Sequence, residues 1–106
     1  MNFETDEHGN LVDISIWTEE VAHELAAADD TMGELTTEHF DVIEYLRDKY
    51  YNENEQPMER VIMKDMSKIW NKKVSSKDLY NLFPGAPSKQ GNRIAGLPYV
   101  ARKGGY

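Results

Sequence analysis

The side chains that could do chemistry in this chain of 106 residues include three histidines and no cysteine. The missing thiols exclude disulfides, thiolate metal sites, cysteine nucleophiles and thiol-based sulfur transfer by the chain's own atoms. His8, His23 and His39 are too far apart for two of them to share one helical turn, which excludes a helical histidine pair that binds a metal. We expect His39 to cap or pack at the start of a helix, and His23 to be solvated. No metal or cofactor is predicted.

Carboxylates and glycines do not point to catalysis either. The adjacent pairs Asp6-Glu7, Glu19-Glu20 and Asp29-Asp30 are interpreted as solvated surface charge rather than as general acid–base pairs. No G-x-S-x-G nucleophile motif occurs. The segment 85–87 (Gly-Ala-Pro), with Lys89 nearby, could form a weak anion site at the start of a helix. A stand-alone enzyme is therefore not predicted.

Charge is distributed very unevenly along the chain. Residues 1–55 hold 16 acidic and 2 basic side chains, a net charge of −14, whereas residues 56–106 hold 3 acidic and 10 basic, a net charge of +7. Such asymmetry predicts a molecule with one acidic and one basic region. Two interpretations stay open. The halves attract each other within the fold, or the basic region faces an acidic partner, either protein or nucleic acid.

Composition predicts one domain over residues 1–106 that does not enter a membrane. Mean hydropathy is −0.70, and no apolar run approaches the roughly 18 residues that a membrane span needs. The first ten residues (MNFETDEHGN) are polar and acidic, unlike a secretory signal peptide, so we expect a cytoplasmic protein.

Helix start and stop signals then supply the elements that must position any functional side chain. Thr18, Thr36 and Ser75 are predicted N-caps, and Gly96 is predicted to end the last helix in the left-handed conformation. The sequence thus predicts a mainly α-helical domain with a small β element possible around the turn at Gly9. The expected helices span residues 19–28, 37–52, 57–69, 76–83 and 87–95, and residues 99–106 are expected to be a flexible arm.

Apolar spacing assigns an inner face to the two longest helices. Phe40, Ile43, Leu46 and Tyr50 form one apolar stripe, which Val42, Tyr45 and Tyr51 widen. The expected inner face of the next helix consists of Met58, Val61, Ile62, Met66 and Ile69. Pro57 is predicted to lie in the first turn of that helix, where its missing N–H costs nothing.

The helices expected over residues 57–69 and 76–83 could also form a helix-turn-helix element. Lys64 and Lys68 would line its first helix, and Lys77, Tyr80 and Asn81 would face outward from its second, recognition helix. A helix pair joined by a short turn is common in all-α domains, so nucleic-acid binding stays an alternative.

Several strings resemble the DsrC/TusE family of small sulfur-relay proteins, in the same order and with the same spacing over nearly the whole chain. The most specific is Lys89-Gln90 followed by the run Arg93–Pro98 (RIAGLP). The matching segments are Glu4–Leu11, Leu35–Tyr50, Pro57–Met63, Asp78–Pro84 and Ala86–Pro98.

The resemblance implies a mostly helical fold with a helix-turn-helix-like element and a flexible C-terminal arm. Such proteins accept sulfur on a penultimate cysteine of that arm. They pass it on in tRNA 2-thiouridine synthesis or work with dissimilatory sulfite reductase. The sulfite-reductase partners carry a second cysteine immediately before the (Arg/Lys)-Ile-Ala-Gly-Leu-Pro run.

This chain departs from the family pattern where the sulfur chemistry is done. Asn92 stands at the first cysteine position, and counting along the arm without gaps places Lys103 at the second, although the penultimate residue here is Gly105. Neither side chain can form a persulfide or a trisulfide. Tyr99-Val100 replaces the Lys-Pro that follows Gly-Leu-Pro in the family, which alters the stiffness of the arm.

The sequence therefore predicts a cysteine-less relative that docks to, or regulates, a sulfurtransferase or a sulfite-reductase-type enzyme. The residues expected to contact that partner are Lys89, Gln90, Arg93, Arg102 and Lys103. Their positive charge would steer encounter with the partner, and Asn92 and Lys103 would make polar contacts in its channel. The alternative is a small nucleic-acid-binding regulator that uses the helix-turn-helix element.

Overall fold

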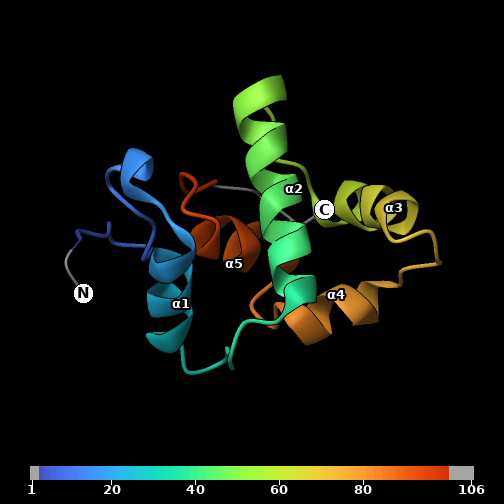
Figure 1. Cartoon of the computed structure of the whole chain (residues 1–106), viewed down its shortest axis with the longest axis horizontal. Helices are drawn as coiled ribbons and strands as arrows, with labels where there is room; N and C mark the ends of the chain where they lie inside the picture. The colour runs from blue at the N-terminus through green and yellow to red at the C-terminus, as the bar shows by residue number, and fades with distance from the viewer. Residues whose placement is uncertain (1–2, 101–106) are drawn as a thin grey trace.

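A computed structural model describes residues 3–100, and within them the chain forms five α-helices and one short 3-10 helix (Figure 1). This confirms the mainly α-helical fold class. The elements are η1 (Ile14–Ile16), α1 (Glu19–Ala27), α2 (Thr37–Glu53), α3 (Glu59–Ile69), α4 (Ser76–Leu82) and α5 (Pro87–Ile94). None of these helices is both long and apolar enough to cross a membrane.

The predicted N-caps begin their helices as expected. The hydroxyl oxygens of Thr18, Thr36 and Ser75 accept hydrogen bonds from backbone N–H groups in the first turns of α1, α2 and α4. His39 completes a capping box, because its Nδ1 accepts from the Thr36 N–H at 3.0 Å. The His39 ring is buried and packs edge-on against Phe83, with ring centroids 5.3 Å apart. The capping and packing role predicted for His39 is confirmed.

Helix α5 lies at the centre of the molecule. In Figure 1 it lies between α1 on one side and α3 and α4 on the other, with α2 crossing in front, and it contacts all four of these helices. The core that surrounds it includes Ile43, Leu46, Ile62, Phe83 and Ile94, none of which is exposed to solvent. A helix that every other helix touches is held in place by the whole core.

The N-terminal region corrects one expectation. The predicted extended piece around Gly9 is reduced to a single antiparallel bridge between Thr5 and Leu11, joined by a turn in which Gly9 has φ +82°. Residues 14–16 form η1 instead of continuing a strand. Asp13 explains this, because its carboxylate accepts from the Ser15 N–H at 3.0 Å and caps the 3-10 turn.

Helix α3 corrects another expectation. Met58 is its N-cap, so Pro57 precedes the helix and does not lie in its first turn. Val61 and Ile69, predicted to face the core, are 39% and 55% exposed. Ile62 and Met66 occupy the inner face; Val61 lies about 100° around the helix from Ile62, whereas Ile69 is close to the direction of Ile62 but is the last residue of the helix. Tyr51, at the end of α2, is likewise exposed.

Candidate functional site

The first turn of α5 is held by a carboxylate from α3. Glu59 is buried, and its Oε1 accepts from the Ser88 N–H at 2.9 Å and from the Ser88 hydroxyl. The Gly85 N–H donates to Oε1 of Gln90 at 2.8 Å. The donors that an anion would need at this helix start are therefore engaged, and a negative charge already lies beside them. The anion site considered for residues 85–87 is thus wrong.

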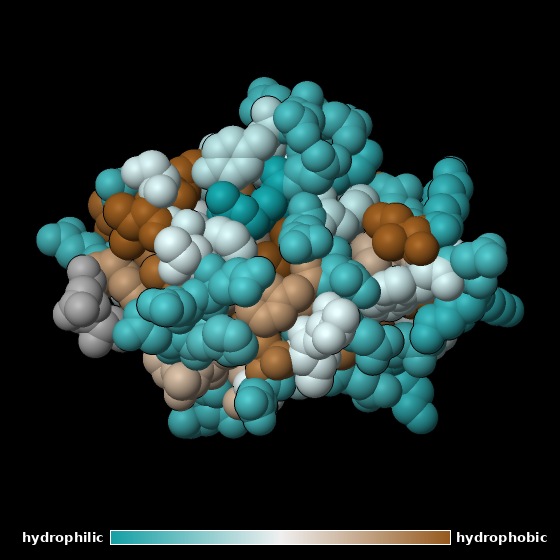
Figure 2. All heavy atoms as spheres, viewed as in Figure 1, coloured by the Kyte–Doolittle hydropathy of each residue, from teal (hydrophilic) through white to brown (hydrophobic). Residues whose placement is uncertain are grey.

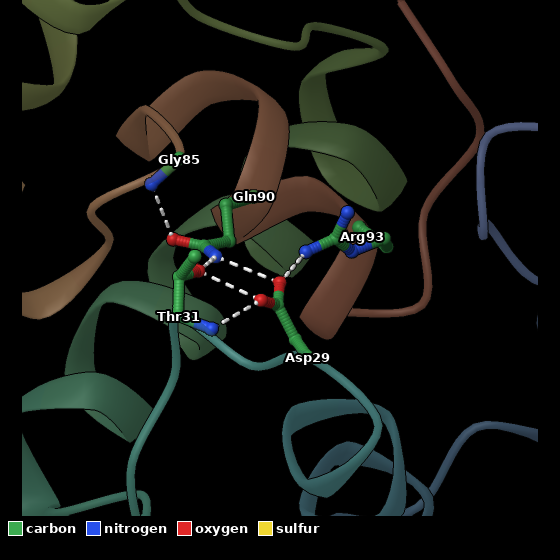
Figure 3. A network of polar contacts seen from close by, with 5 residues as sticks. All are labelled: Asp29, Thr31, Gly85, Gln90 and Arg93. Carbon is green, nitrogen blue, oxygen red and sulfur yellow. Dashed lines mark hydrogen bonds and ion pairs between the residues drawn. The ribbon is translucent and has the colours of Figure 1, made fainter.

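A polar cluster ties α5 to the loop between α1 and α2 (Figure 3). We use the name polar cluster for Asp29, Thr31, Gly85, Gln90 and Arg93. The Gln90 side-chain amide donates to Asp29 Oδ2 and to Thr31 Oγ1, both at 2.8 Å, while the Arg93 guanidinium forms an ion pair with the same carboxylate. Thr31 also donates to Asp29 Oδ1 through its backbone N–H (2.9 Å) and its hydroxyl (2.7 Å).

These contacts set the ionisation of Asp29. Partial burial by itself would raise the pKa of its carboxyl, but hydrogen bonds from Thr31 and Gln90 and the charge of Arg93 outweigh burial, so the pKa lies below its ordinary value. The expectation that Asp29 is merely solvated is wrong, whereas its neighbour Asp30 is exposed. The polar cluster therefore holds α5 in place through an ion pair and hydrogen bonds, and it is not a pair of general acid–base groups.

Two hollows of about 390 and 380 Å³ lie beside Asp29 and Arg93, which line both of them. The second hollow is also lined by His8 and Tyr99, whose rings stack with centroids 3.5 Å apart and planes 6° apart. Lys89 contributes a cation to the same hollow. The start of the C-terminal segment thus lies against the N-terminal turn, beside the polar cluster.

Backbone carbonyls at the end of α5 and just after it accept hydrogen bonds from four side chains elsewhere in the chain. Trp17 Nε1 donates to the Ile94 carbonyl at 2.9 Å, and Arg47 donates to the Ala95 carbonyl at 2.8 Å while stacking on the Trp17 ring. Further on, the side chains of Asn10 and Gln56 donate to the carbonyls of Leu97 and Pro98, each at 2.9 Å. The path of residues 94–98 is therefore held by directed hydrogen bonds.

Gly96 makes this path possible. Its φ of +74° confirms the predicted left-handed conformation, and a Cβ added there would lie 2.3 Å from Cδ1 of Trp17. Only glycine combines this backbone conformation with so close an indole ring.

Asn92, which the resemblance places at the first cysteine position of the family, lies inside the molecule. It is 2% exposed, and its side-chain N–H donates to the Ser88 carbonyl. Its Oδ1 has no hydrogen-bond partner in the described part of the chain. A partner cannot reach this side chain without α5 moving, so it does not offer the polar contact in a partner's channel that the sequence suggested.

The residues predicted to contact a partner occupy different environments. Lys89 is exposed, Arg93 is partly buried in its ion pair with Asp29, and Gln90 is buried with its amide fully engaged. Because their polar groups are engaged within the protein, Gln90 and Arg93 would affect partner binding chiefly through the shape of the surface. Arg102 and Lys103, with the rest of the arm beyond residue 100, lie outside the described residues.

The residues of the helix-turn-helix alternative lie together on α3 and α4. Lys64, Lys68, Lys77 and Asn81 are exposed, and Tyr80 is half-buried. The structure thus places the predicted basic side chains on one pair of adjacent helices. Within residues 3–100, no group of three or more histidine, aspartate or glutamate side chains could hold a metal ion.

Sequence reasoning missed Asp29, Thr31, Glu59 and the pair Trp17 and Arg47. The Asp-x-Thr spacing at 29–31 carries a local signal, since aspartate often accepts from a backbone N–H two residues on. No local signal announces the other contacts, because they join residues as much as 77 positions apart.

The sequence is similar to that of a known protein family. Residues 1–101 match the family described as "DsrC like protein". The chain is 40% identical to the sulfurtransferase TusE of Escherichia coli (strain K12) over 96 residues, which cover 90% of this chain and 86% of that protein. The TusE of Salmonella typhimurium is 39% identical over 95 residues, 89% of this chain and 85% of that protein.

Solved structures agree with this match. The chain superimposes on Allochromatium vinosum DsrC with a TM-score of 0.85 at 40% identity, covering 95% of this chain and 89% of the other. It matches the oxidised gamma-subunit of dissimilatory sulfite reductase (DsrC) of Archaeoglobus fulgidus with a TM-score of 0.85 at 36% identity, covering 95% and 91%. A chain of dissimilatory sulfite reductase I gives a TM-score of 0.77 at 30% identity, covering 95% and 90%.

Proposed function

The chain belongs to the DsrC/TusE family of sulfur-relay proteins, and from that premise we propose that it docks to a sulfur-relay partner without carrying sulfur itself. The observation that supports this most directly is the absence of any cysteine from a chain that retains the family's fold. The partner would be a sulfurtransferase or an enzyme of the sulfite-reductase type. By occupying the partner's docking surface, the chain would regulate access of a sulfur-carrying relative.

The chemical part of the proposal rests on the thiol. Attack on a persulfide sulfur needs a thiolate, and a transferred sulfur atom needs a sulfur atom to stay bound to. Asn92 offers an amide that is already engaged with Ser88, and Lys103 offers an amine. A chain with these groups at both positions can bind where a carrier binds but cannot accept the sulfur.

The docking part of the proposal rests on the fixed position of the segment that leads into the arm. The segment 94–98 is held by four directed side-chain hydrogen bonds, and Tyr99 stacks on His8. Lys89 is exposed at the adjacent hollow, where it can pair with an acidic group on a partner. The positive charges of Arg102 and Lys103 follow in the arm and would add to the steering of encounter.

Binding can be measured by titration calorimetry against the sulfurtransferases and sulfite-reductase-type enzymes purified from the source organism. We expect one of them to bind, and removal of residues 99–106 or the substitution Lys89→Glu to weaken binding at least tenfold. Glu24→Lys, a charge reversal of the same size and opposite sign on the exposed side of α1, is the control and should leave affinity unchanged. The proposal is wrong if none of these enzymes binds the intact chain.

Restoring a thiol separates docking from chemistry. With radiolabelled persulfide on the partner, the natural chain should acquire no label, whereas Lys103→Cys should acquire it because its thiol lies at the family's carrier position. Lys89→Cys presents an exposed thiol outside the arm and serves as the matched control. Equal labelling of the two variants would indicate random collision and would count against a retained docking geometry.

The comparisons do not favour the nucleic-acid-binding alternative. The chain's net charge of −7 also opposes approach to a phosphate backbone.

A further inference from the structure

The three acidic side chains of the α3–α4 region are all engaged in contacts that build the fold. Glu59 accepts from Ser88 on α5. Asp65 accepts from the Tyr45 hydroxyl at 2.5 Å, and this contact together with burial raises the pKa of Tyr45. Asp78 closes the capping box of α4, where the backbone N–H and hydroxyl of Ser75 lower its pKa.

The basic side chains of the same region are arranged in the opposite way. All six are exposed, and we call them the basic face: Arg60, Lys64, Lys68, Lys72, Lys73 and Lys77. Lys72 lies 4.0 Å from Glu38, and the other five have no ion pair within residues 3–100. The fold therefore leaves this positive charge uncompensated, although the chain as a whole is acidic.

Apolar surface accompanies this charge. A hollow of about 10 Å³, the size of one water molecule, lies between α3 and α4 and is too small for a side chain. Val61 and Ile69 add exposed apolar side chains to α3 itself. On the right of Figure 2, where α3 lies in Figure 1, a brown group is bordered by teal side chains.

From this combination we propose that α3 and α4 form a docking site for an acidic amphipathic helix of a partner protein. Acidic side chains of that helix would pair with Arg60, Lys64 and Lys77, and its apolar side chains would pack on the exposed Val61 and Ile69 of α3. Charge complementarity selects the acidic partner. The exposed apolar side chains of Val61 and Ile69 favour a protein helix over a nucleic acid, whose phosphate backbone has no apolar side chain to pack on them. This site is separate from the α5 surface proposed above and does not depend on it.

The test is a nuclear magnetic resonance titration of the intact chain with three probes. The first is an 18-residue helical peptide of glutamate and leucine, with the leucines on one face. The second is the same composition with the leucines scattered, and the third is a 20-base-pair DNA duplex. We expect saturable shifts of α3 and α4 resonances with the first peptide, and at least tenfold weaker binding of the other two at equal salt.

Charge reversal locates the site. The double variant Arg60→Glu, Lys64→Glu should weaken the first peptide at least tenfold, and Lys89→Glu on α5 should leave its affinity unchanged; circular dichroism checks that both variants fold. Four results would overturn the proposal. They are no saturable binding, equal binding of the scattered peptide, tighter binding of the duplex, or loss of peptide affinity in Lys89→Glu instead of the double variant. Tighter binding of the duplex than of the peptide would assign the basic face to nucleic acid.

Discussion

Charged side chains in two regions of this molecule are used in opposite ways. Around α5, the two charged side chains that are wholly or partly buried have partners inside the protein: Arg93 pairs with Asp29, and Oε1 of Glu59 accepts from Ser88, whereas Lys89 is exposed. On the basic face, five of six cations have no ion pair among the described residues. Charges that are opposed internally contribute to folding, whereas charges left in solvent contribute little to it and stay available to a partner. Substitutions should therefore cost stability around α5 and not on the basic face.

The largest expected loss is at the end of α5. Gly96→Ala should lower the free energy of unfolding by about 3 kcal/mol or more, because it adds a left-handed alanine and a collision with Trp17. Urea unfolding measures this loss. Gly33→Ala is the control, since a Cβ there meets nothing within 4 Å. Equal stability of the two variants would show that the segment after α5 is not held as described.

The polar cluster should give the next largest effect. Asp29→Asn should cost about 2 kcal/mol, because it removes the charge that Arg93 and Gln90 contact. The adjacent, exposed Asp30→Asn should cost less than about 0.5 kcal/mol in the same urea titration. A similar loss in both variants would mean that the cluster contributes no more than surface charge does.

Asp29 also predicts a pH dependence. Its pKa is lowered in the folded chain, so its stabilisation is fully present above the ordinary aspartate pKa of about 3.9 and is lost as pH falls through the lower folded value. The natural chain should therefore lose more stability than Asp29→Asn between pH 5 and pH 2. Unfolding curves at both ends of this range test the difference, and parallel losses would contradict it.

Position 92 should respond more weakly. Asn92→Cys gives up a hydrogen bond to Ser88 but also removes a buried acceptor without a partner, so stability should change by less than about 1 kcal/mol. The new thiol should react with a thiol reagent about 100-fold more slowly than that of Lys89→Cys, because a buried group reacts only after local opening. Comparable reaction rates would show that position 92 is accessible.

The basic face should give the smallest effect. Replacing Lys64 and Lys68 together by glutamine should change the free energy of unfolding by less than about 0.5 kcal/mol, since neither lysine has an ion pair to lose within the described residues. Thermal unfolding followed by circular dichroism is sufficient. A loss as large as that of Asp29→Asn would erase the difference between the two regions.

Local signals in the sequence determined much of this protein. The caps at Thr18, Thr36 and Ser75, the left-handed glycine at 96 and the helical apolar spacing predicted where helices begin and end, because these signals act within a few residues. The absence of cysteine is also a property of the sequence alone, and the expectation that Asn92 and Lys103 stand at the family's cysteine positions came from the resemblance of the sequence.

Only the tertiary structure decided which charges are internal. Asp29 and Asp30 are chemically identical neighbours, yet Asp29 holds α5 in place and Asp30 is solvated. The difference arises because Gln90 and Arg93, more than 60 positions away in the sequence, contact Asp29. In the same way, Val61 and Ile69 match the apolar spacing of α3 but are exposed, since both the width and the length of the buried stripe depend on what packs against the helix. Periodicity reveals a helix's faces, but burial depends on contacts distant in sequence.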